Sequence, residues 1–80
     1  MNIMVRLKNI QRKDNLIEAD FYPEGSKIAG HIVVDLTTEE NISCKEVFGY
    51  GPSYKFFAKR RLIKMVKNNE IKSEDIIMWY

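Results

Sequence analysis

Apolar and polar residues alternate along the first half of the chain and change to a helical spacing in the second half. Residues 3–8 show the two-residue period of a strand with one buried face, and the same period recurs over residues 17–22 and 31–36. It returns more weakly over residues 42–47. The alternation therefore predicts four consecutive strands.

One pairing register brings apolar residues together on one face of the first two strands and opposite charges together on the other. It places residues 12–14 in the connecting loop. The expected pairs are Leu7 with Ala19 and Val5 with Phe21 on the inner face, and Lys8 with Glu18 and Arg6 with Asp20 on the outer face. A slip of one residue would turn every apolar side chain to the wrong face, so burial and charge predict the same register.

From Ser53 onward the apolar residues follow the spacing of an amphipathic helix that extends to about Asn68. The helical stripe consists of Tyr54, Phe57, Ala58, Arg61, Leu62, Met65 and Val66. Ser53 is a favoured N-cap residue, or Pro52 takes the first helical position with Gly51 before it. Asn68 or Asn69 can end the helix in the left-handed conformation. Residues 76–80 are too few for another helix and favour a short terminal strand, although Ser73-Glu74-Asp75 could instead start one helical turn.

This order of elements predicts a single α+β domain over residues 1–80, an antiparallel β-meander of about four strands with one helix packed on one face and a short C-terminal strand. The expected interior consists of Val5, Leu7, Ala19, Phe21, Ile32, Val34, Leu36, Phe57, Leu62 and Met65. A chain of 80 residues has a core that is only just sufficient for stability.

Charge is distributed in blocks, although the net charge is only +2. Residues 1–13 carry bases and no acid, residues 14–46 are strongly acidic, and residues 47–80 are basic again. The predicted helix over residues 54–67 carries six bases and no acid. Either the acidic strands compensate this charge within the molecule, or the helix faces an anionic partner.

The anionic partner with the strongest chemical argument is a nucleic acid. In that alternative Lys55, Lys59, Arg60 and Lys64 contact phosphates from the exposed side of the helix over residues 54–67. The observation that discriminates between the two explanations is the position of Glu18, Asp20 and Asp35 relative to the helix. If these acids neutralise the helix, the reason to expect nucleic-acid binding disappears.

A second candidate surface follows from apolar residues that the alternation places on the outer face of the sheet. They are Met4, Ile10, Leu16, Tyr22, Val33 and Val47. A contiguous set of exposed apolar residues marks an interface with a partner. The leading hypothesis is therefore a small non-enzymatic interaction module or homo-oligomer, most simply a homodimer, that acts through this outer face.

Neither the single histidine nor the single cysteine is placed in a catalytic arrangement by the alternation. His31 falls on the outer face opposite Val47, which is neither a nucleophile nor a metal ligand. Ile42 and Cys44 fall on the inner face, where Cys44 is expected to be a small buried hydrophobic residue. Its nearest base, Lys45, is on the other face, so nothing indicates an activated thiol.

The outer-face carboxylates also do not predict an enzyme. Arg6 and Lys8 are the expected partners of Asp20 and Glu18 and would keep both acids ionised, whereas an acid catalyst needs a raised pKa. The sequence therefore predicts no catalytic residue, no cofactor and no metal site.

The N-terminal segment and the lone cysteine bear on the cellular compartment. Arg6 interrupts the first apolar run, and the sequence contains no signal-peptide core or membrane span. A single cysteine is typical of a reducing compartment. We therefore expect a cytoplasmic protein without a membrane partner.

Several short motifs carry a resemblance that covers nearly the whole chain. They are Phe21-Tyr22-Pro23-Glu24-Gly25-Ser26, Gly30-His31-Ile32-Val33-Val34-Asp35, Gly51-Pro52-Ser53-Tyr54 and Met78-Trp79-Tyr80. Together they are similar to uncharacterised short proteins of low-GC bacteria. The resemblance implies a bacterial, cytoplasmic protein and implies no mechanism.

Overall fold

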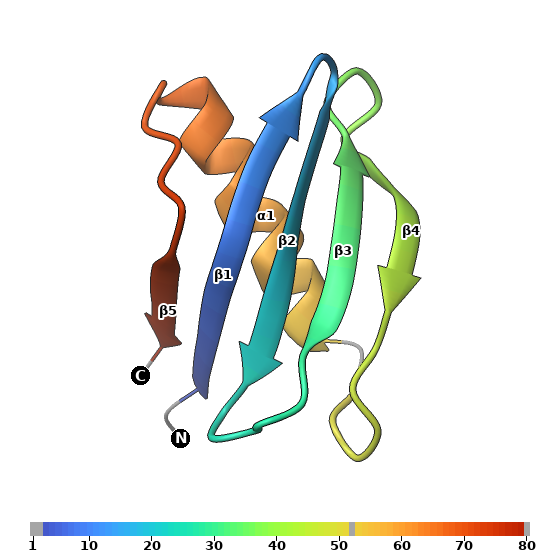
Figure 1. Ribbon diagram of the computed structural model, residues 1–80, viewed down its shortest axis with the longest axis vertical. Helices are drawn as coiled ribbons and strands as arrows, with labels where there is room; N and C mark the ends of the chain where they lie inside the picture. Colours follow the sequence, from blue (N-terminus) through green and yellow to red (C-terminus); the bar gives the residue numbers. More distant parts are fainter. Residues whose placement is uncertain (1–2, 52, 80) are drawn as a thin grey trace.

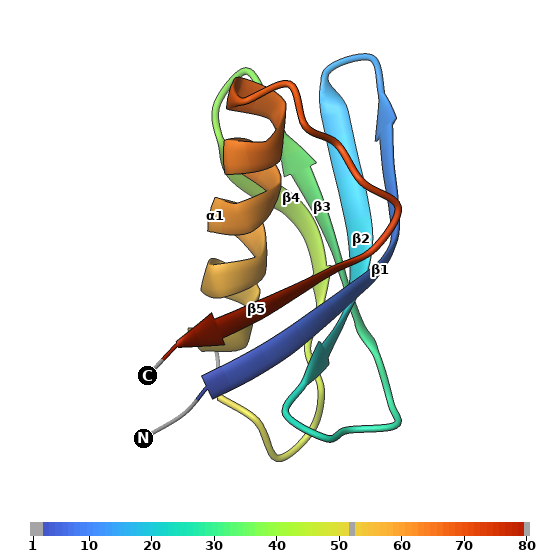
Figure 2. The same ribbon diagram turned by 90° about the vertical axis from the view of Figure 1, so that its left-hand side faces the viewer.

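A five-stranded antiparallel sheet forms one layer of the molecule, and a helix packed on one of its faces forms the other (Figures 1 and 2). The computed structural model describes the backbone of residues 3–51 and 53–79 and the side chains of residues 4–51 and 53–77. The elements are β1 (Ile3–Lys13), β2 (Leu16–Pro23), β3 (Gly30–Asp35), β4 (Glu40–Lys45), α1 (Ser53–Lys67) and β5 (Asp75–Trp79). The predicted α+β meander with one covering helix is confirmed.

The strand order in the sheet is β4-β3-β2-β1-β5, with every neighbouring pair antiparallel. The first four strands form the expected meander. After β4 the chain crosses one face of the sheet as α1, and β5 then pairs with the free edge of β1 (Figure 1). Val5 lies opposite Ile77 in this last pair, so the terminal strand adds a buried residue to the core.

The pairing of β1 with β2 differs from the expected register by two residues. Leu7 lies opposite Phe21 and Lys8 opposite Asp20. The connection is a tight turn at Asp14 and Asn15, shorter than the expected loop, because Asp14 adopts a positive φ of 54°. Since the shift is even, Val5 and Leu7 still face the core, but the expected Lys8–Glu18 and Arg6–Asp20 pairs are wrong.

A β-bulge in β1 places Ile10 in the core, although the alternation predicted it on the outer face. The register shifts between Lys8 and Gln11, so that Asn9 and Ile10 together lie opposite Ala19. Asn9 adopts a φ of 55°, a left-handed conformation that asparagine tolerates better than most residues. The extra residue inverts the alternation, and the Ile10 side chain is only 5% exposed.

The core lies between the sheet and α1. Its buried apolar residues are Val5, Leu7, Ile10, Ile17, Ala19, Phe21, Ile32, Val34, Val47, Ala58, Leu62, Met65 and Ile77. Of the ten residues expected in the interior, Leu36 and Phe57 are half-buried and the other eight are buried. The helical stripe was therefore predicted correctly at Leu62 and Met65.

Strand β4 departs from the expected pattern in three ways. Ile42 lies in a bulge, because Ser43 pairs with Val33 while Asn41 pairs with Val34, and its side chain is 56% exposed. Cys44 is exposed as well, which corrects the expectation that it is buried. The physical reason is position, since β4 is an edge strand.

Val47 is the third correction, because it is buried in the core and not on the outer face. Strand β4 ends at Lys45, so the alternation of the strand does not extend to Val47. The chain instead makes a turn in which the Tyr50 N–H donates to the Val47 carbonyl over 3.2 Å. Gly49 supplies the positive φ of 90° that this turn uses.

Helix α1 ends in the predicted left-handed cap, at Asn69 with a φ of 54°. The Glu70 N–H donates to the Met65 carbonyl over 2.9 Å, and the Asn69 N–H donates to the Val66 carbonyl over 3.1 Å. This pair of bonds is the Schellman motif, which satisfies carbonyls that the last turn leaves free. No helix within residues 3–51 and 53–79 is long and apolar enough to cross a membrane.

Candidate interaction surfaces

Three of the six bases on α1 form ion pairs with acids at the margins of the sheet. The Lys55 Nζ lies 2.8 Å from the Glu46 Oε1 and the Lys67 Nζ lies 3.3 Å from the Glu39 Oε2. At the other edge, the Arg61 Nε lies 3.1 Å from the Asp75 Oδ2. Of the four expected phosphate contacts, Lys55 is therefore already paired.

The other three bases, Lys59, Arg60 and Lys64, have no acidic partner among the residues that the structure describes. Ala58 and Leu62 turn toward the sheet, so Arg60 and Lys64 are exposed on the opposite side of the helix.

An exposed aromatic ring lies beside these bases. The Phe56 side chain is 48% exposed, and the Lys59 Nζ lies 5.9 Å from the centre of its ring. We call Phe56, Lys59, Arg60 and Lys64 the basic helix face.

The acids that were expected to decide the charge balance do not neutralise α1. Glu18 and Asp20 alternate with the buried residues Ile17 and Ala19, which face the helix, so these two carboxylates lie on the opposite face of the sheet. Asp35 accepts a hydrogen bond from the Thr37 N–H over 2.8 Å in the turn after β3. The compensation that exists comes from other acids at the sheet margins.

The outer face of the sheet is less apolar than the sequence predicted. Of the six residues expected there, Ile10 and Val47 are in the core; the remaining four are Met4, Leu16, Tyr22 and Val33. Charged residues lie directly beside them, because Tyr22 pairs with Arg6 and Leu16 pairs with Asp35. The face is a mixed surface and not a contiguous apolar patch.

Tyr22 lies between two cations on this face. The Arg6 Cζ is 5.2 Å and the Lys8 Nζ is 5.7 Å from the centre of the Tyr22 ring. The guanidinium of Arg6 also donates to the Ser26 carbonyl over 3.2 Å. These bases contact an aromatic ring and a loop in place of the carboxylates that the sequence predicted.

A polar network around His31 occupies the centre of the outer face. The His31 Nδ1 lies 2.7 Å from the Asp20 Oδ1, and the Asn9 amide donates to the Asp20 Oδ2 over 2.8 Å. On its other side, the His31 Nε2 lies 3.5 Å from the Glu18 Oε2. The hydrogen bonds from Asn9 and His31 lower the pKa of Asp20, because they stabilise the carboxylate.

The sequence contained a signal for this network that the strand analysis missed. The alternation predicts Val47 as the neighbour of His31 on the following strand, but the actual neighbour there is Lys45. On the other side Asp20 lies directly opposite His31, as the outer-face positions of both residues allow. Asn9 could not have been placed there, because the bulge determines its direction.

The Cys44 thiol is not activated. Although the residue is exposed, partial desolvation raises the pKa of the thiol, and the positive charge of Lys55 only partly opposes that effect. The thiol form therefore persists to higher pH than in a free cysteine.

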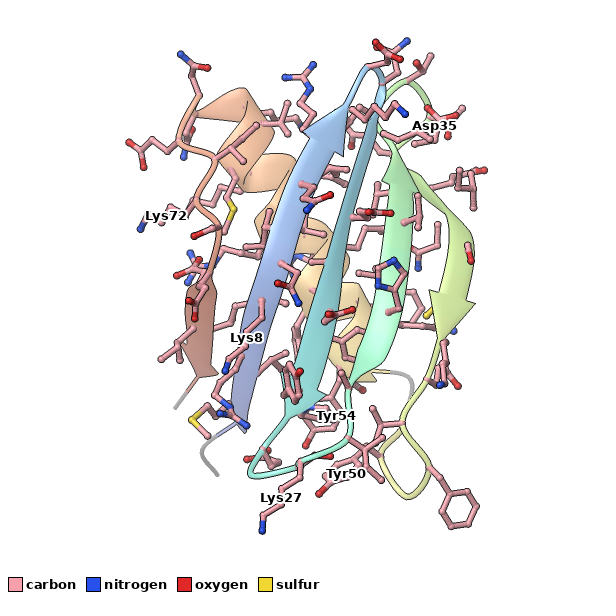
Figure 3. The ribbon with its side chains drawn as sticks, viewed as in Figure 1. Lys8, Lys27, Asp35, Tyr50, Tyr54 and Lys72 are labelled. Atoms are coloured by element: carbon pink, nitrogen blue, oxygen red, sulfur yellow. The ribbon has the colours of Figure 1, made fainter. Side chains whose placement is uncertain are left out.

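The end of the molecule that carries the β2–β3 and β4–α1 loops is held together by two tyrosines (Figure 3). The Tyr50 and Tyr54 rings meet edge to face, with centres 5.7 Å apart. The Tyr54 hydroxyl donates to the Glu24 carboxylate over 2.8 Å, and this hydrogen bond raises the pKa of Tyr54. The start of α1 is thereby tied to the β2–β3 loop.

No protein-family model, curated protein or solved structure matches the chain. The fold and its two surfaces therefore define it only as a small α+β domain. Within the described part of the chain, no group of three or more histidine, cysteine, aspartate or glutamate side chains could hold a metal ion.

Proposed function

We propose that the protein is a small non-enzymatic binding module that contacts the phosphate backbone of nucleic acid through the basic helix face. The observation that carries the proposal is the contrast within α1. Lys55, Arg61 and Lys67 are paired with acids, whereas the outward-facing Arg60 and Lys64 have no acidic partner among the described residues. Unpaired cations on an exposed face supply the electrostatic part of nucleic-acid binding.

The spacing of the three free bases suits a phosphate backbone. Residues 59–64 cover about 7.5 Å of helix axis at about 1.5 Å per residue. One strand of a duplex carries a phosphate about every 3.4 Å of its axis, so Lys59, Arg60 and Lys64 can reach neighbouring phosphates of one strand. Phe56 adds an exposed ring on which a base of a single strand can stack.

Repulsion between these bases destabilises the helix, and this supports a role for them in binding. Arg60 and Lys64 are one turn apart on α1, an arrangement that destabilises a helix by a few tenths of a kcal/mol. Lys64 and Lys67 lie in the last turn, where cations are favourable, but Lys59 and Arg60 lie near the middle. A bound polyanion would remove the repulsion. The proposal includes the cytoplasm as the compartment, which the single cysteine supports.

The proposal is tested with fluorescently labelled duplex and single-stranded oligonucleotides in a low-salt anisotropy titration. Three phosphate contacts give a slope of log affinity against log salt of about −2.7 on duplex DNA and about −2.1 on a single strand. The triple variant K59E/R60E/K64E should lose binding while keeping its far-ultraviolet circular dichroism spectrum, because Arg60 and Lys64 are exposed and Lys59 is half-buried.

The matched control is the triple variant K13E/K27E/K72E, which changes the net charge equally at exposed positions outside α1. This control variant should keep most of the wild-type affinity for the oligonucleotides. Absence of wild-type binding at tens of micromolar protein would refute the proposal. An equal loss of affinity in both triple variants would also refute it, because binding would then follow net charge and not the basic helix face.

A second copy of the chain on the outer sheet face is the second candidate, and one observation favours it. In the described structure α1 covers only the inner face, and the outer face carries bases at Arg6 and Lys8 and acids at Glu18 and Asp20 (Figure 2). A twofold axis could bring the bases of one copy onto the acids of the other. Light scattering over a concentration series tests this, and a monomer at every concentration would exclude it.

A further inference from the structure

One aromatic side chain on α1 points away from the core into solvent. Phe56 is 48% exposed, whereas Ala58 and Leu62, on the opposite side of the helix, are completely buried. The ring belongs neither to the buried cluster nor to the half-buried residues that pack against it. The fold therefore gains little from this ring, and its exposed surface is available to a partner.

Three bases follow Phe56 along the side of α1 that the sheet leaves uncovered (Figure 2). Lys59 and Arg60 are three and four residues after Phe56, and Lys64 is one turn beyond Arg60. None of the three forms an ion pair with another described residue. Residues three and four apart are neighbours on a helix surface, so the ring and the cations form one continuous line.

We propose that this line binds single-stranded nucleic acid, with one base stacked on the Phe56 ring and the neighbouring phosphates on Lys59, Arg60 and Lys64. The inference rests on the proposed function and names the form of nucleic acid that the basic helix face takes. Surfaces that bind single strands combine a cationic track for the backbone with aromatic rings on which bases stack. Because a phenylalanine ring has no hydrogen-bonding atoms, we expect little preference for base sequence.

Acids on both flanks of α1 disfavour a duplex at this surface. Glu39 and Glu46 are exposed on one flank, and Asp75 lies on the other. The major groove is about 12 Å wide and a helix with its side chains is about 10–12 Å wide, so a helix in the groove has a phosphate backbone against each flank. These acids would then face phosphates. A single strand along the uncovered side of α1 avoids them, and its bases are not engaged by a complementary strand.

The two ammonium groups near the Phe56 ring differ in their freedom to move. The Lys55 Nζ lies 5.6 Å from the ring centre and is held 2.8 Å from the Glu46 Oε1. The Lys59 Nζ lies 5.9 Å from the same ring centre and has no acidic partner among the described residues. Lys55 therefore stays beside the ring, whereas the flexible side chain of Lys59 can follow the phosphate of the stacked nucleotide.

The test compares the wild type and F56A by anisotropy with three labelled ligands. They are a thymidine single strand, the same strand paired with its complement, and a strand of equal length with abasic sites in place of the bases. F56A should weaken binding of the thymidine strand about 5–150-fold, the range expected for loss of one base–aromatic stack. It should weaken binding of the other two ligands much less, because they present phosphates without a free base. The wild type should bind the abasic strand about as weakly as F56A binds the thymidine strand.

F48A is the matched control, because Phe48 is fully exposed but lies in the loop between β4 and α1. It should bind all three ligands as the wild type does, and both variants should keep the wild-type circular dichroism spectrum. Equal wild-type affinity for the thymidine and abasic strands would overturn this inference alone, since phosphate contacts would then account for all of the binding. An equal loss in F48A and F56A would also overturn it. Absence of wild-type binding to every ligand would refute the proposed function and this inference together.

Discussion

Replacement of Ile10 by alanine is the sharpest test of the bulge in β1, because the alternation and the structure predict opposite results. The alternation places Ile10 on the outer face and Ile42 on the inner face. In the structure Ile10 is 5% exposed and belongs to the core, whereas Ile42 is 56% exposed in the bulge of β4. The two side chains are chemically identical, so I42A is the matched control for I10A.

The expected magnitudes follow from the burial of the two side chains. An isoleucine-to-alanine change removes three carbon atoms, worth about 2.4 kcal/mol at about 0.8 kcal/mol per buried carbon. At Ile10 a cavity term adds to this, for a total of about 3 kcal/mol. At Ile42 more than half of the side chain is already in water and no closed cavity forms, so the loss is about 1 kcal/mol.

Urea denaturation followed by circular dichroism measures both variants. A domain of 80 residues has an m-value near the lower end of about 1–3 kcal/mol per molar urea, so I10A should lower the midpoint by about 2–3 M. I42A should lower it by about 1 M or less. A loss for I10A no larger than that for I42A would refute the bulge and restore the regular alternation.

Three further changes test other details of the fold by the same denaturation assay. G30A should lower the free energy of unfolding by more than 2 kcal/mol, because the new methyl group would lie 2.5 Å from the Lys45 carbonyl oxygen and against the Phe21 ring; equal stability would contradict the tight contact. N69A should lower the free energy of unfolding by about 1 kcal/mol and N69G should lower it much less, since Asn69 has a φ of 54° that glycine adopts more easily than alanine. Equal losses in the two variants would contradict the left-handed cap. Y54F should lower the free energy of unfolding by about 1 kcal/mol at neutral pH, because it removes the hydrogen bond to Glu24. The folded pKa of Tyr54 is raised above 10.0, so the wild type should lose this advantage as the pH rises above 10. A stability difference that stays constant up to pH 11 would contradict the bond to Glu24.

The strands and the helix could be predicted because their residues repeat with a regular period. The alternation around Leu7, Ala19 and Val34 and the helical spacing of Leu62 and Met65 each indicate one buried face, and the structure buries all five residues. A repeated pattern averages over several positions, so a single irregular residue does not hide it. The fold class follows from these faces, because the helical stripe needs the sheet to cover it.

Two of the misplaced residues, Ile10 and Val47, follow an interruption of the period. The bulge at Asn9 inverts the position of Ile10, and the end of β4 at Lys45 separates Val47 from the pattern of that strand. Asn9 is one of several asparagines in the chain, and nothing in the sequence marks it as the one with a positive φ. Cys44 was misplaced for another reason, because alternation gives the face of a residue and not its distance from the edge of the sheet.

The ion pairs of α1 depend on contacts between residues that are far apart in the sequence. The block of acids before Val47 favours compensation of the basic helix, but only Glu39 and Glu46 from that block form ion pairs with it. The third partner, Asp75, comes from the strand after the helix. Sequence neighbours could not identify these acids, because the pairs depend on where α1 crosses the sheet.

Because the paired acids lie beside the helix, the positive charge that they leave uncompensated on α1 is on the side that faces away from the sheet. Glu39, Glu46 and Asp75 lie at the margins of the sheet and neutralise the flanks of the helix, while Glu18 and Asp20 are separated from it by the whole sheet. Fields from exposed charges fall off within about 10 Å at 0.1 M salt, so acids beyond the sheet do little to weaken the outward face. A chain with a small net charge can therefore present one strongly cationic side. Two variants of equal net charge should therefore bind differently when one loses bases on the basic helix face and the other loses bases outside α1.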